Sequence, residues 1–412
     1  MRILLLSQSY PPEASSSAQK VGEMATFLSE RGHQVTVLTA FPNYPGGVVF
    51  QGYKRTLRQT EQLGEIKLVR SWLHVTKARD RFAPRMLSYV TFAATALVAG
   101  LPLGKQDVIY VYAPPTFLVP TAQVLAKLLR AKLVVDIHDL WPDAPIHLGF
   151  VKHPAAIKAA RLFEKWTLAA PDRILSYSRT HLRKLEEKGV PKAKLGLVPL
   201  WIDTQIFAPV TGDAPKQLRA EHGFGDKFVV AYTGNIGIPQ GLDTVLNCAA
   251  QLQARGETQT QFALVGGGAE RERLMAQAET MGLKNVTFVP PQPMSQMPLW
   301  MAAADALLLH LDHAPFREGT VPGKLFYYMA SGRPVIAAAI GETADIVHEH
   351  NCGYAVPPRD PQKMADAIAL LAKDPAQRVA MGANGRKAAI AVYERAKVLV
   401  TMEAELATAA GD

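Results

Sequence analysis

Short apolar runs alternate with longer amphipathic segments along the first half of the chain. Six runs predict buried strands, over residues 2–6, 34–39, 107–112, 132–137, 173–177 and 194–198. Continuous runs rich in Val, Ile and Leu are typical of parallel strands that are covered on both faces. Residues 17–31 predict a helix after the first strand, and helical segments separate the later strands. This alternation predicts an α/β fold with a doubly wound parallel sheet.

The same alternation restarts after a break at residues 199–215, which is rich in Pro, Asp and Thr. Strands are predicted over residues 228–232, 261–265, 286–289, 306–309 and 334–338, and a helical tract over 361–410. A chain of 412 residues also exceeds the size at which one hydrophobic core usually stops growing. We therefore predict two Rossmann-like domains, residues 1–200 and 201–393, whose sheets face each other across a cleft. Ligands of such sheets bind beyond the carboxyl ends of the strands.

Composition narrows the class of protein. Hydrophobic residues make up 48% and charged residues 20%, which is the composition of a folded globular protein. The two cysteines, Cys248 and Cys352, lie in apolar contexts and exclude a disulfide framework or a cysteine metal site. Residues 1–6 predict a strand and lack the longer apolar region of a signal peptide, which favours the cytoplasm.

The net charge of +9 is unevenly distributed along the chain. Residues 1–200 hold 27 Lys and Arg against 14 Asp and Glu, whereas residues 201–412 hold 18 against 22. A basic first half suits an anionic membrane surface or a lipid phosphate, and it also fits ordinary solubility charge. Nucleic acid is a poor fit as a partner, because the excess is dispersed and no recognition motif with interleaved aromatics is present.

One uncharged apolar segment, Met86–Gly104, is only about long enough to reach the lower limit of a membrane-spanning helix. Basic residues precede it, at Lys77, Arg79, Arg81 and Arg85. Two interpretations stay open. The segment is either an interfacial helix that makes peripheral contact with an anionic inner membrane on its cytoplasmic face, or an ordinary core helix of the first sheet.

The loop after the first predicted strand, residues 8–17, is a candidate acceptor or phosphate loop. Small residues such as Ser15 and Ser16 let the backbone approach a ligand, and amides at a helix start can bind an anion. Glu13 lies in the same loop. The alternative is that a serine here only caps the following helix.

The end of the strand at residues 132–137 carries an imidazole and carboxylates. His138 can hydrogen-bond a sugar or a phosphate, and Asp139 can orient it or accept a proton from an acceptor. The alternative is a structural histidine. Its place beyond a predicted strand end favours a functional role.

Two glycine-containing loops of the second domain are candidate donor-binding elements. The first supplies Gly234, Asn235, Gly237 and Gln240, and the second supplies Gly266 and Gly267. Asn235 and Gln240 are neutral donors for phosphate oxygens. Neither loop is a G-x-G-x-x-G fingerprint, so a dinucleotide cofactor is disfavoured. The alternative for the second loop is close packing of a strand against a helix.

The stretch at residues 315–336 is the most informative part of the sequence about the candidate site. It predicts a polar loop, a short helix beginning near Lys324, a glycine turn and a buried strand. Helix-start amides beside Lys324 would form a diphosphate site that needs no metal. No Asp-x-Asp pair, which commonly holds a divalent ion in transferases, occurs in the sequence. We therefore expect no metal cofactor.

Together, in order along almost the whole chain, these motifs resemble glycosyltransferase family four. The resemblance rests on Arg31–Val37, Pro11–Glu13, His138–Pro142, Gly234–Gly237 and the stretch from Lys324 to Ile336. The most similar subgroup is that of bacterial O-antigen fucosamine transferases. The resemblance implies a GT-B fold, a nucleotide-sugar-binding second domain, an acceptor-binding first domain and retention of anomeric configuration. It also implies that a helix at residues 394–412 returns to the first domain.

The resemblance also implies roles for single residues. His138 matches a histidine near the donor sugar, and Gly234, Asn235 and Gln240 fall where the family binds the donor phosphates. The family often has Arg and Lys in that loop, a role that Lys324 would take over here. The family's paired glutamates would fall at Gly319 and Tyr327, and Glu318 lies one residue away from the first. Tyr327 can offer one hydroxyl to the nucleotide ribose.

We therefore expect a metal-independent, retaining hexosyltransferase of bacterial surface polysaccharide synthesis. The donor would be a UDP-sugar and the acceptor a saccharide or a polyprenyl-diphosphate-linked saccharide. The expected catalytic residues are His138, Asp139, Glu318 and Lys324, and Tyr328 is predicted to join the donor contacts. Two alternatives stay open: a nucleotide-sugar epimerase of similar architecture, and a non-catalytic homologue that acts as a scaffold.

Overall fold

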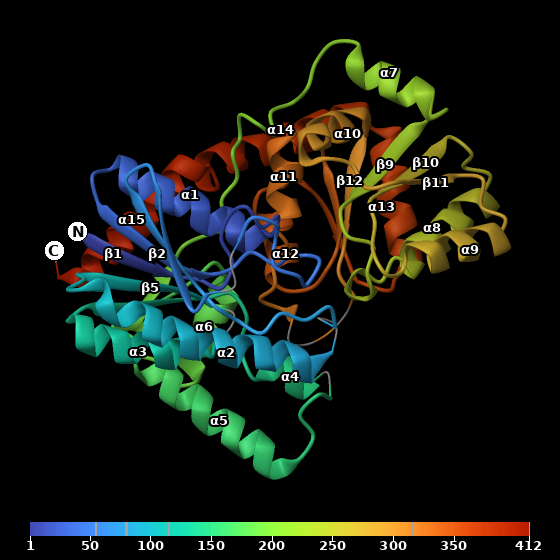
Figure 1. The fold of residues 1–412 in the computed structure, drawn as a ribbon. Coiled ribbons are helices and arrows are strands. Elements are labelled where there is room, and N and C mark those ends of the chain that lie inside the picture. Colours follow the sequence, from blue (N-terminus) through green and yellow to red (C-terminus); the bar gives the residue numbers. More distant parts are fainter. Residues whose placement is uncertain are drawn as a thin grey trace. The chain divides into compact units, whose positions relative to one another are not determined.

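In the computed structural model, the chain forms two compact units (Figure 1). Unit 1 contains Met1–Pro199 and Leu399–Asp412, and unit 2 contains Leu200–Val398. The structure describes residues 1–53, 56–78, 81–113, 116–147, 149–312, 314 and 317–411. Arg79 and the first two residues of the stretch 315–336, both of which the sequence analysis used, lie outside these ranges.

The sheet of unit 1 has eight strands in the order β3-β4-β2-β1-β5-β6-β7-β8. The strands are β1 (Arg2–Leu6), β2 (Gln34–Ala40), β3 (Arg58–Leu63), β4 (Ile66–Ser71), β5 (Val108–Ala113), β6 (Lys132–Ile137), β7 (Arg173–Ser176) and β8 (Leu195–Leu197). All neighbouring pairs are parallel except β3 and β4, which are antiparallel. The strand order reverses between β1 and β5, so the carboxyl ends around this point form the expected ligand edge.

Helices connect the parallel strands of unit 1. They are α1 (Ser16–Glu30), α2 (Phe82–Gly100), α3 (Leu118–Leu129), α4 (Asp143–His147), α5 (Pro154–Ala169) and α6 (Arg179–Glu187). Strand residues such as Leu4, Ile109 and Val135 pack with Phe92 of α2 and Leu125 of α3 in one hydrophobic core. Because both faces of a parallel sheet need cover, the strands had to be apolar throughout.

Unit 2 has a parallel six-stranded sheet in the order β11-β10-β9-β12-β13-β14. The strands are β9 (Phe228–Thr233), β10 (Thr260–Val265), β11 (Val286–Val289), β12 (Ala306–His310), β13 (Val335–Ala338) and β14 (Gly353–Val356). The helices are α7 (Ala214–Glu221), α8 (Asp243–Ala254), α9 (Arg271–Thr280), α10 (Met297–Ala303), α11 (Lys324–Ala330), α12 (Glu342–Glu349), α13 (Pro361–Lys373) and α14 (Pro375–Val392). The order reverses between β9 and β12, which brings the loops after these strands together.

The last helix, α15 (Arg395–Ala410), begins in unit 2 and continues in unit 1. Near its start, Arg395 forms an ion pair with Asp203 of unit 2. Farther along, Glu403 pairs with His33 at 2.8 Å and with Arg31 at 3.1 Å, both in unit 1. Glu405 pairs with Arg173 of the same unit.

Three features differ from the expected elements. The β3–β4 hairpin was not predicted, because β3 is a polar edge strand with no apolar run. The four-residue strand β14 was also missed, since it is short and begins at Gly353. The single helical tract expected over residues 361–410 is three helices, because Asp360 and Asp374 cap new helices that each begin with proline.

The apolar segment at residues 86–104 lies within α2 and the 3-10 turn that follows it, Leu101–Leu103. Among the described residues it is the one helix long and apolar enough to cross a membrane, and 28% of its most apolar window is buried. Phe92 and Ala96 face the core, whereas Leu87, Val90 and Val98 are exposed. Both open interpretations keep support, because one face packs as a core helix and the other is an exposed apolar surface.

Candidate active site

His138 follows the carboxyl end of β6 and is held by a buried polar cluster. Its Nε2 lies 3.0 Å from the Asp136 carboxylate, which also accepts a 2.5 Å hydrogen bond from the Tyr110 hydroxyl. Its ring stacks on Tyr112 with the centroids 4.1 Å apart, and the Tyr112 hydroxyl lies 3.4 Å from Nδ1. Because a carboxylate only accepts, this arrangement places a proton on Nε2.

The tyrosines of this cluster stay protonated and can donate. Burial, with the charge of Asp136 as a second cause, raises the pKa of Tyr112 and the pKa of Tyr110 well above the ordinary value. One carboxylate oxygen of Asp136 is buried without a hydrogen-bond partner in the described part of the chain. Both nitrogens of His138 therefore face protein groups, and the next residue, Asp139, is exposed at the strand end.

The first βα loop of unit 1 is organised by its own polar residues. Glu13 is buried, and its Oε1 accepts hydrogen bonds from the backbone amides of Asn43 at 2.7 Å and Tyr44 at 2.9 Å. Ser15 is the N-cap of α1 and accepts from the amide of Ala18 at 3.2 Å, so the capping alternative holds for this residue. Ser16, the first residue of α1, is exposed. Glu13 thus ties two loops together through their backbones.

Lys324 opens α11 and reaches back to the end of β9 in unit 2. Its Nζ donates to the carbonyl oxygen of Thr233 at 2.9 Å and lies 3.9 Å from the centroid of the Tyr232 ring. A Cβ atom at Gly234 would come within 3.1 Å of this nitrogen. Burial lowers the pKa of Lys324 to about 7. Because of its position, the Lys324 side chain supplies the positive charge beside the first glycine loop whenever it is protonated.

The loop after β9 uses most of its polar groups internally. The amides of Gly234 and Ile236 bond to the carbonyls of Val265 and Gly267, at 2.9 Å and 2.7 Å. The Gln240 side-chain oxygen accepts from the amide of Gly237 at 3.2 Å and lies 3.4 Å from the Asn235 side-chain amide. Asn235 is exposed. The sequence analysis proposed the side-chain amides of Asn235 and Gln240 as donors to a phosphate. The two side chains contact each other in this turn, and with Lys324 they remain the candidate donors of the loop.

The glycines of the second loop are closely packed, as the alternative interpretation expected, but against another loop and a proline ring and not against a helix. A Cβ atom at Gly266 would lie 1.9 Å from the Gly234 carbonyl oxygen, and Gly266 has a φ of +154°. A Cβ atom at Gly267 would lie 2.7 Å from the Pro291 ring. Glycine is required here so that two loops can run side by side.

The residues at and beside the expected positions of the paired glutamates, Glu318, Tyr327 and Tyr328, each contact different neighbours. The backbone carbonyl of Glu318 accepts from the amide of Glu342 at 2.8 Å, which joins this loop to the start of α12. Tyr327 is half-buried and stacks on Phe207, with ring centroids 4.5 Å apart. Tyr328 is fully buried, and its hydroxyl accepts from the amide of Thr233 at 3.0 Å. The Tyr328 hydroxyl also lies 3.3 Å from the Thr233 carbonyl oxygen that holds Lys324. Its predicted contact with the donor stays a prediction.

Comparison with known families decides the class of protein. A model described as "Glycosyl transferase 4-like domain" matches residues 17–201, and one described as "Glycosyl transferases group 1" matches residues 215–388. The chain is 31% identical over 348 residues to "Putative colanic acid biosynthesis glycosyl transferase WcaI" of Escherichia coli K12, covering 82% of this chain and 83% of that protein. The chain belongs to the group 1 glycosyltransferases of family four.

Other relatives of this glycosyltransferase agree with the assignment. It is 26% identical over 268 residues to "Probable glycosyltransferase WbjE" of Pseudomonas aeruginosa, covering 64% of this chain and 66% of the relative. The crystal structure of Anabaena Alr3699/HepE in complex with UDP has a TM-score of 0.73 and 16% sequence identity, covering 99% of this chain and 100% of that one. The structural likeness confirms the predicted GT-B fold.

One polar residue of this glycosyltransferase was missed by the sequence analysis. His310 ends β12, and its Nδ1 lies 2.5 Å from the Gln240 carbonyl oxygen. It is 1% exposed, and its Nε2 is buried without a hydrogen-bond partner among the described residues. Burial lowers the pKa of His310, so the neutral ring supports the Gln240 turn. A histidine that ends an apolar strand next to a switch point is the sequence signal that could have identified it.

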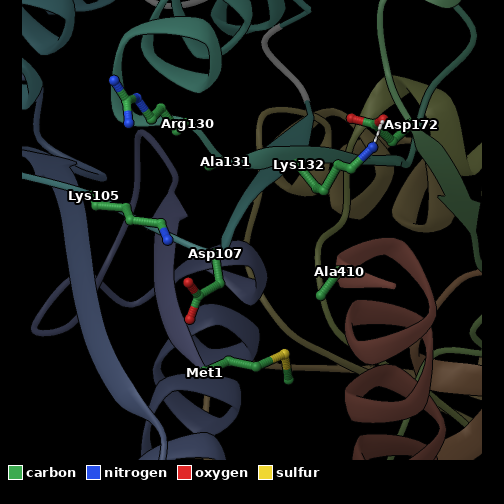
Figure 2. A pocket seen from close by; sticks show the side chains of 8 residues that line it. All are labelled: Met1, Lys105, Asp107, Arg130, Ala131, Lys132, Asp172 and Ala410. Carbon is green, nitrogen blue, oxygen red and sulfur yellow. Dashed lines mark hydrogen bonds and ion pairs between the residues drawn. The ribbon is translucent and has the colours of Figure 1, made fainter. Parts of the chain in front are cut away.

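A basic pocket of about 670 Å³ in unit 1 lies away from the carboxyl ends of the strands, where His138 stands (Figure 2). It is lined by residues that include Lys105, Asp107, Arg130 and Lys132. Asp107 and Lys132 stand at the amino ends of β5 and β6, whereas His138 follows the carboxyl end of β6. Asp107 pairs with Arg2 at 2.9 Å and Lys132 with Asp172 at 3.0 Å. The pocket is therefore at the sheet edge opposite the candidate site.

His138 and Asp139 belong to unit 1, whereas Lys324, Glu318 and the glycine loops belong to unit 2. Within unit 2 the structure brings together Lys324, Thr233, Gly234 and Tyr328. Within unit 1 it brings together His138, Asp136 and Tyr112. Among the described residues, no three His, Cys, Asp or Glu side chains form a group that could hold a metal ion.

Proposed function

We propose that this protein transfers a hexose from a UDP-sugar, with retention and without a metal ion, onto a saccharide or polyprenyl-diphosphate-linked acceptor in bacterial surface polysaccharide synthesis. The observation that carries the proposal is the position of Lys324. Its ammonium group lies at the carboxyl end of β9, bonded to the Thr233 carbonyl oxygen and beside Gly234. A cation at a strand end next to a glycine is suited to a diphosphate.

Two relatives support the proposed pathway and the proposed UDP-sugar donor. The E. coli relative is named for colanic acid biosynthesis, and the Anabaena structure is described as a complex with UDP. The basic first half of the chain suits an anionic lipid acceptor and peripheral contact with an anionic inner membrane on its cytoplasmic face.

The proposed chemistry centres on the leaving diphosphate. When the sugar–phosphate bond breaks, negative charge grows on the diphosphate, and Lys324 and the Asn235 side-chain amide would stabilise it. His138 would exchange the long 3.4 Å contact of its Nδ1 with the Tyr112 hydroxyl for a hydrogen bond to the donor sugar. Asp139, exposed beside it, would orient the acceptor hydroxyl or accept its proton. Glu318 would contact the donor sugar, and Tyr327 would offer its hydroxyl to the ribose.

The first test is a panel of UDP-, GDP- and dTDP-sugars, measured by thermal shift and by donor hydrolysis with EDTA present. We expect the UDP-sugars to stabilise the protein most and hydrolysis to continue without metal. Analysis of the product's anomeric configuration tests retention. Binding of no nucleotide-sugar would refute the transferase and favour a scaffold, and isomerised donor in the absence of acceptor would favour the epimerase.

A further inference from the structure

An apolar pocket in unit 1 begins beside the loop that carries His138. It has a volume of about 260 Å³ and is lined mainly by Phe117, Trp141, Pro142, Ala159, Ala160 and Phe163. Trp141 stands three residues after His138, and α5 forms the opposite wall. The pocket is almost entirely apolar, so it suits a hydrocarbon ligand better than a saccharide.

Aromatic rings in mutual contact extend from this pocket in both directions. Phe117 contacts Trp141 and Phe163 with centroid distances of 5.6 Å each. Trp141 stacks on Phe82, the first residue of α2, at 6.3 Å, and Phe163 contacts Trp166 at 6.0 Å. Trp166 is 47% exposed. The rings therefore form an aromatic row that leads from the His138 loop to the surface of α5.

The wall of the pocket is fixed by ion pairs that neutralise its one charged lining residue. Glu164 is buried and pairs with Lys188 and with Arg161 at 3.1 Å. Asp143 of α4 pairs with the same two cations, at 2.8 Å and 2.6 Å. Burial alone would raise the pKa of Asp143, but Lys188 and Arg161 outweigh it and lower the pKa. These ion pairs join α4 and α5 and fix the position of Glu164 at the pocket wall.

The outer face of α5 has little protein cover. Glu164 and Thr167 are the buried residues of this helix, and Leu162 is 70% exposed. Figure 1 shows α5 at the periphery of unit 1. Its exposed cations, Lys158 and Lys165, flank the apolar residues. Exposed apolar residues beside cations complement an amphiphile with an anionic head.

A further cation lies at the other end of the aromatic row. Arg85 is one helical turn from Phe82 and lies within electrostatic range of Asp139. Its Nε is buried and has no hydrogen-bond partner in the described part of the chain. A phosphate near the His138 loop would satisfy this donor, while an attached chain would follow the aromatic row.

We propose that the aromatic pocket between Trp141 and α5 binds the isoprenoid chain of the acceptor's lipid diphosphate, with Arg85 contacting the phosphate. The inference rests on the proposed function, because it assumes a lipid-linked acceptor. It assigns the apolar part of that acceptor to one site in unit 1, separate from the nucleotide loops of unit 2.

The test uses purified full-length protein and dansyl-labelled prenyl diphosphates of 5, 10 and 15 carbons, with inorganic diphosphate as the competitor. In the wild type we expect affinity to rise by about tenfold or more from the shortest to the longest chain, because each buried methylene adds to binding. Ala160→Phe should fill the pocket and weaken binding of the 15-carbon probe at least tenfold. Phe163→Ser should weaken it in the same direction without filling the pocket.

Ala169→Phe is the matched control, because Ala169 is exposed on the same helix and does not line the pocket. It should bind the probes as the wild type does, and circular dichroism should show that all variants are folded. Equal affinity for all chain lengths, or equal losses in Ala160→Phe and Ala169→Phe, would overturn the proposal. The proposal would also be overturned if Ala160→Phe and Phe163→Ser lost binding to anionic vesicles but still bound the 15-carbon probe. The pocket surface would then contact the bilayer as a whole and not a single isoprenoid chain.

Failure of the proposed function and failure of the proposed chain site would give different results. If Ala160→Phe removes chain-length dependence but the wild type transfers no sugar, the chain site stands and the transferase reaction does not. If transfer to a lipid-linked acceptor is equally fast in Ala160→Phe and the wild type, the reaction stands and the chain site does not.

Discussion

Lys324 Nζ donates a 2.9 Å hydrogen bond to the Thr233 carbonyl oxygen. This single bond connects the first residue of α11 to the last residue of β9, which are 91 positions apart in the chain. Tyr328, one turn farther along α11, bonds to the amide of the same Thr233 at 3.0 Å. Both contacts fix the ammonium group beside Gly234, where the proposed donor diphosphate binds.

Replacing Lys324 by methionine should slow sugar transfer strongly. Methionine keeps most of the side-chain volume and removes the charge that would stabilise the leaving diphosphate. We expect kcat/KM to fall on the order of 100-fold or more, as when one charge-stabilising donor is lost. Steady-state kinetics with the preferred UDP-sugar measure the effect. Lys216→Met is the control, because Lys216 is 81% exposed on α7, and its rate should equal that of the wild type.

Donor affinity should depend on pH through Lys324. Its pKa of about 7 in the free protein means that the charged form dominates below pH 7 and is lost above it. The diphosphate of a nucleotide-sugar is esterified at both ends and does not titrate in this range. We therefore expect Kd to increase above pH 7, by at most about tenfold per pH unit, because binding must take up a proton.

Calorimetry from pH 6 to pH 9 checks this dependence. Proton uptake should appear as a heat that varies with the ionisation enthalpy of the buffer. In Lys324→Met the affinity should be weak and nearly constant over the same range. A wild-type affinity that does not change between pH 6 and pH 9 would show that Lys324 is not the titrating cation.

Gly266→Ala should destabilise unit 2. The new methyl group would overlap the Gly234 carbonyl oxygen, 1.9 Å away, and the φ of +154° disfavours a side chain. We expect a loss of about 3 kcal/mol or more in the free energy of unfolding, from strain and overlap together. The thermal midpoint should fall clearly.

Gly282→Ala separates the two causes of that loss. Gly282 also has a positive φ, of +62°, but nothing lies within 4 Å of its Cβ position. Its substitution should cost only about 1 kcal/mol, the price of the backbone conformation alone. Equal thermal midpoints for the two variants would contradict the role of loop packing at Gly266.

Asp136→Asn should disturb His138 without changing the shape of the cluster. The carboxylate accepts from His138 Nε2 at 3.0 Å, whereas an amide can also present a donor to that nitrogen. We expect the ring to shift toward the tautomer protonated on Nδ1, and transfer to fall by roughly tenfold or more, as in loss of general acid–base positioning.

Nitrogen NMR of the histidine side chains reports the tautomer directly. Asp172→Asn is the control, because Asp172 is an exposed partner of Lys132 at the opposite edge of the sheet. An unchanged tautomer in Asp136→Asn, with lowered activity, would mean that Asp136 acts on the fold rather than on His138.

The parallel core strands could be predicted because burial on both faces leaves an apolar run that is visible in the sequence. The runs at β1, β5 and β9 are such strands. The edge strand β3 could not be predicted, because its side chains are mostly exposed and carry no pattern of burial. Its place is decided by backbone pairing with β4.

The candidate site also contains residues that could be predicted from the sequence and residues that could not. His138 could be identified because a polar residue after a buried strand stands at the ligand edge of a parallel sheet. Its partners could not be assigned, since Tyr110 and Tyr112 read as ordinary members of an apolar strand. Only the pairing of β5 with β6 brings their hydroxyls to Asp136 and His138.

The sequence by itself determined the α/β class, the ordered motifs and the residues at the strand ends, because these depend on local periodicity and on residue chemistry. Tertiary structure decided which groups are available. It buried Tyr328, used the glycines of the second loop for packing and placed Lys324 on Thr233. Availability depends on contacts between residues far apart in the chain, and such contacts leave no local pattern in the sequence.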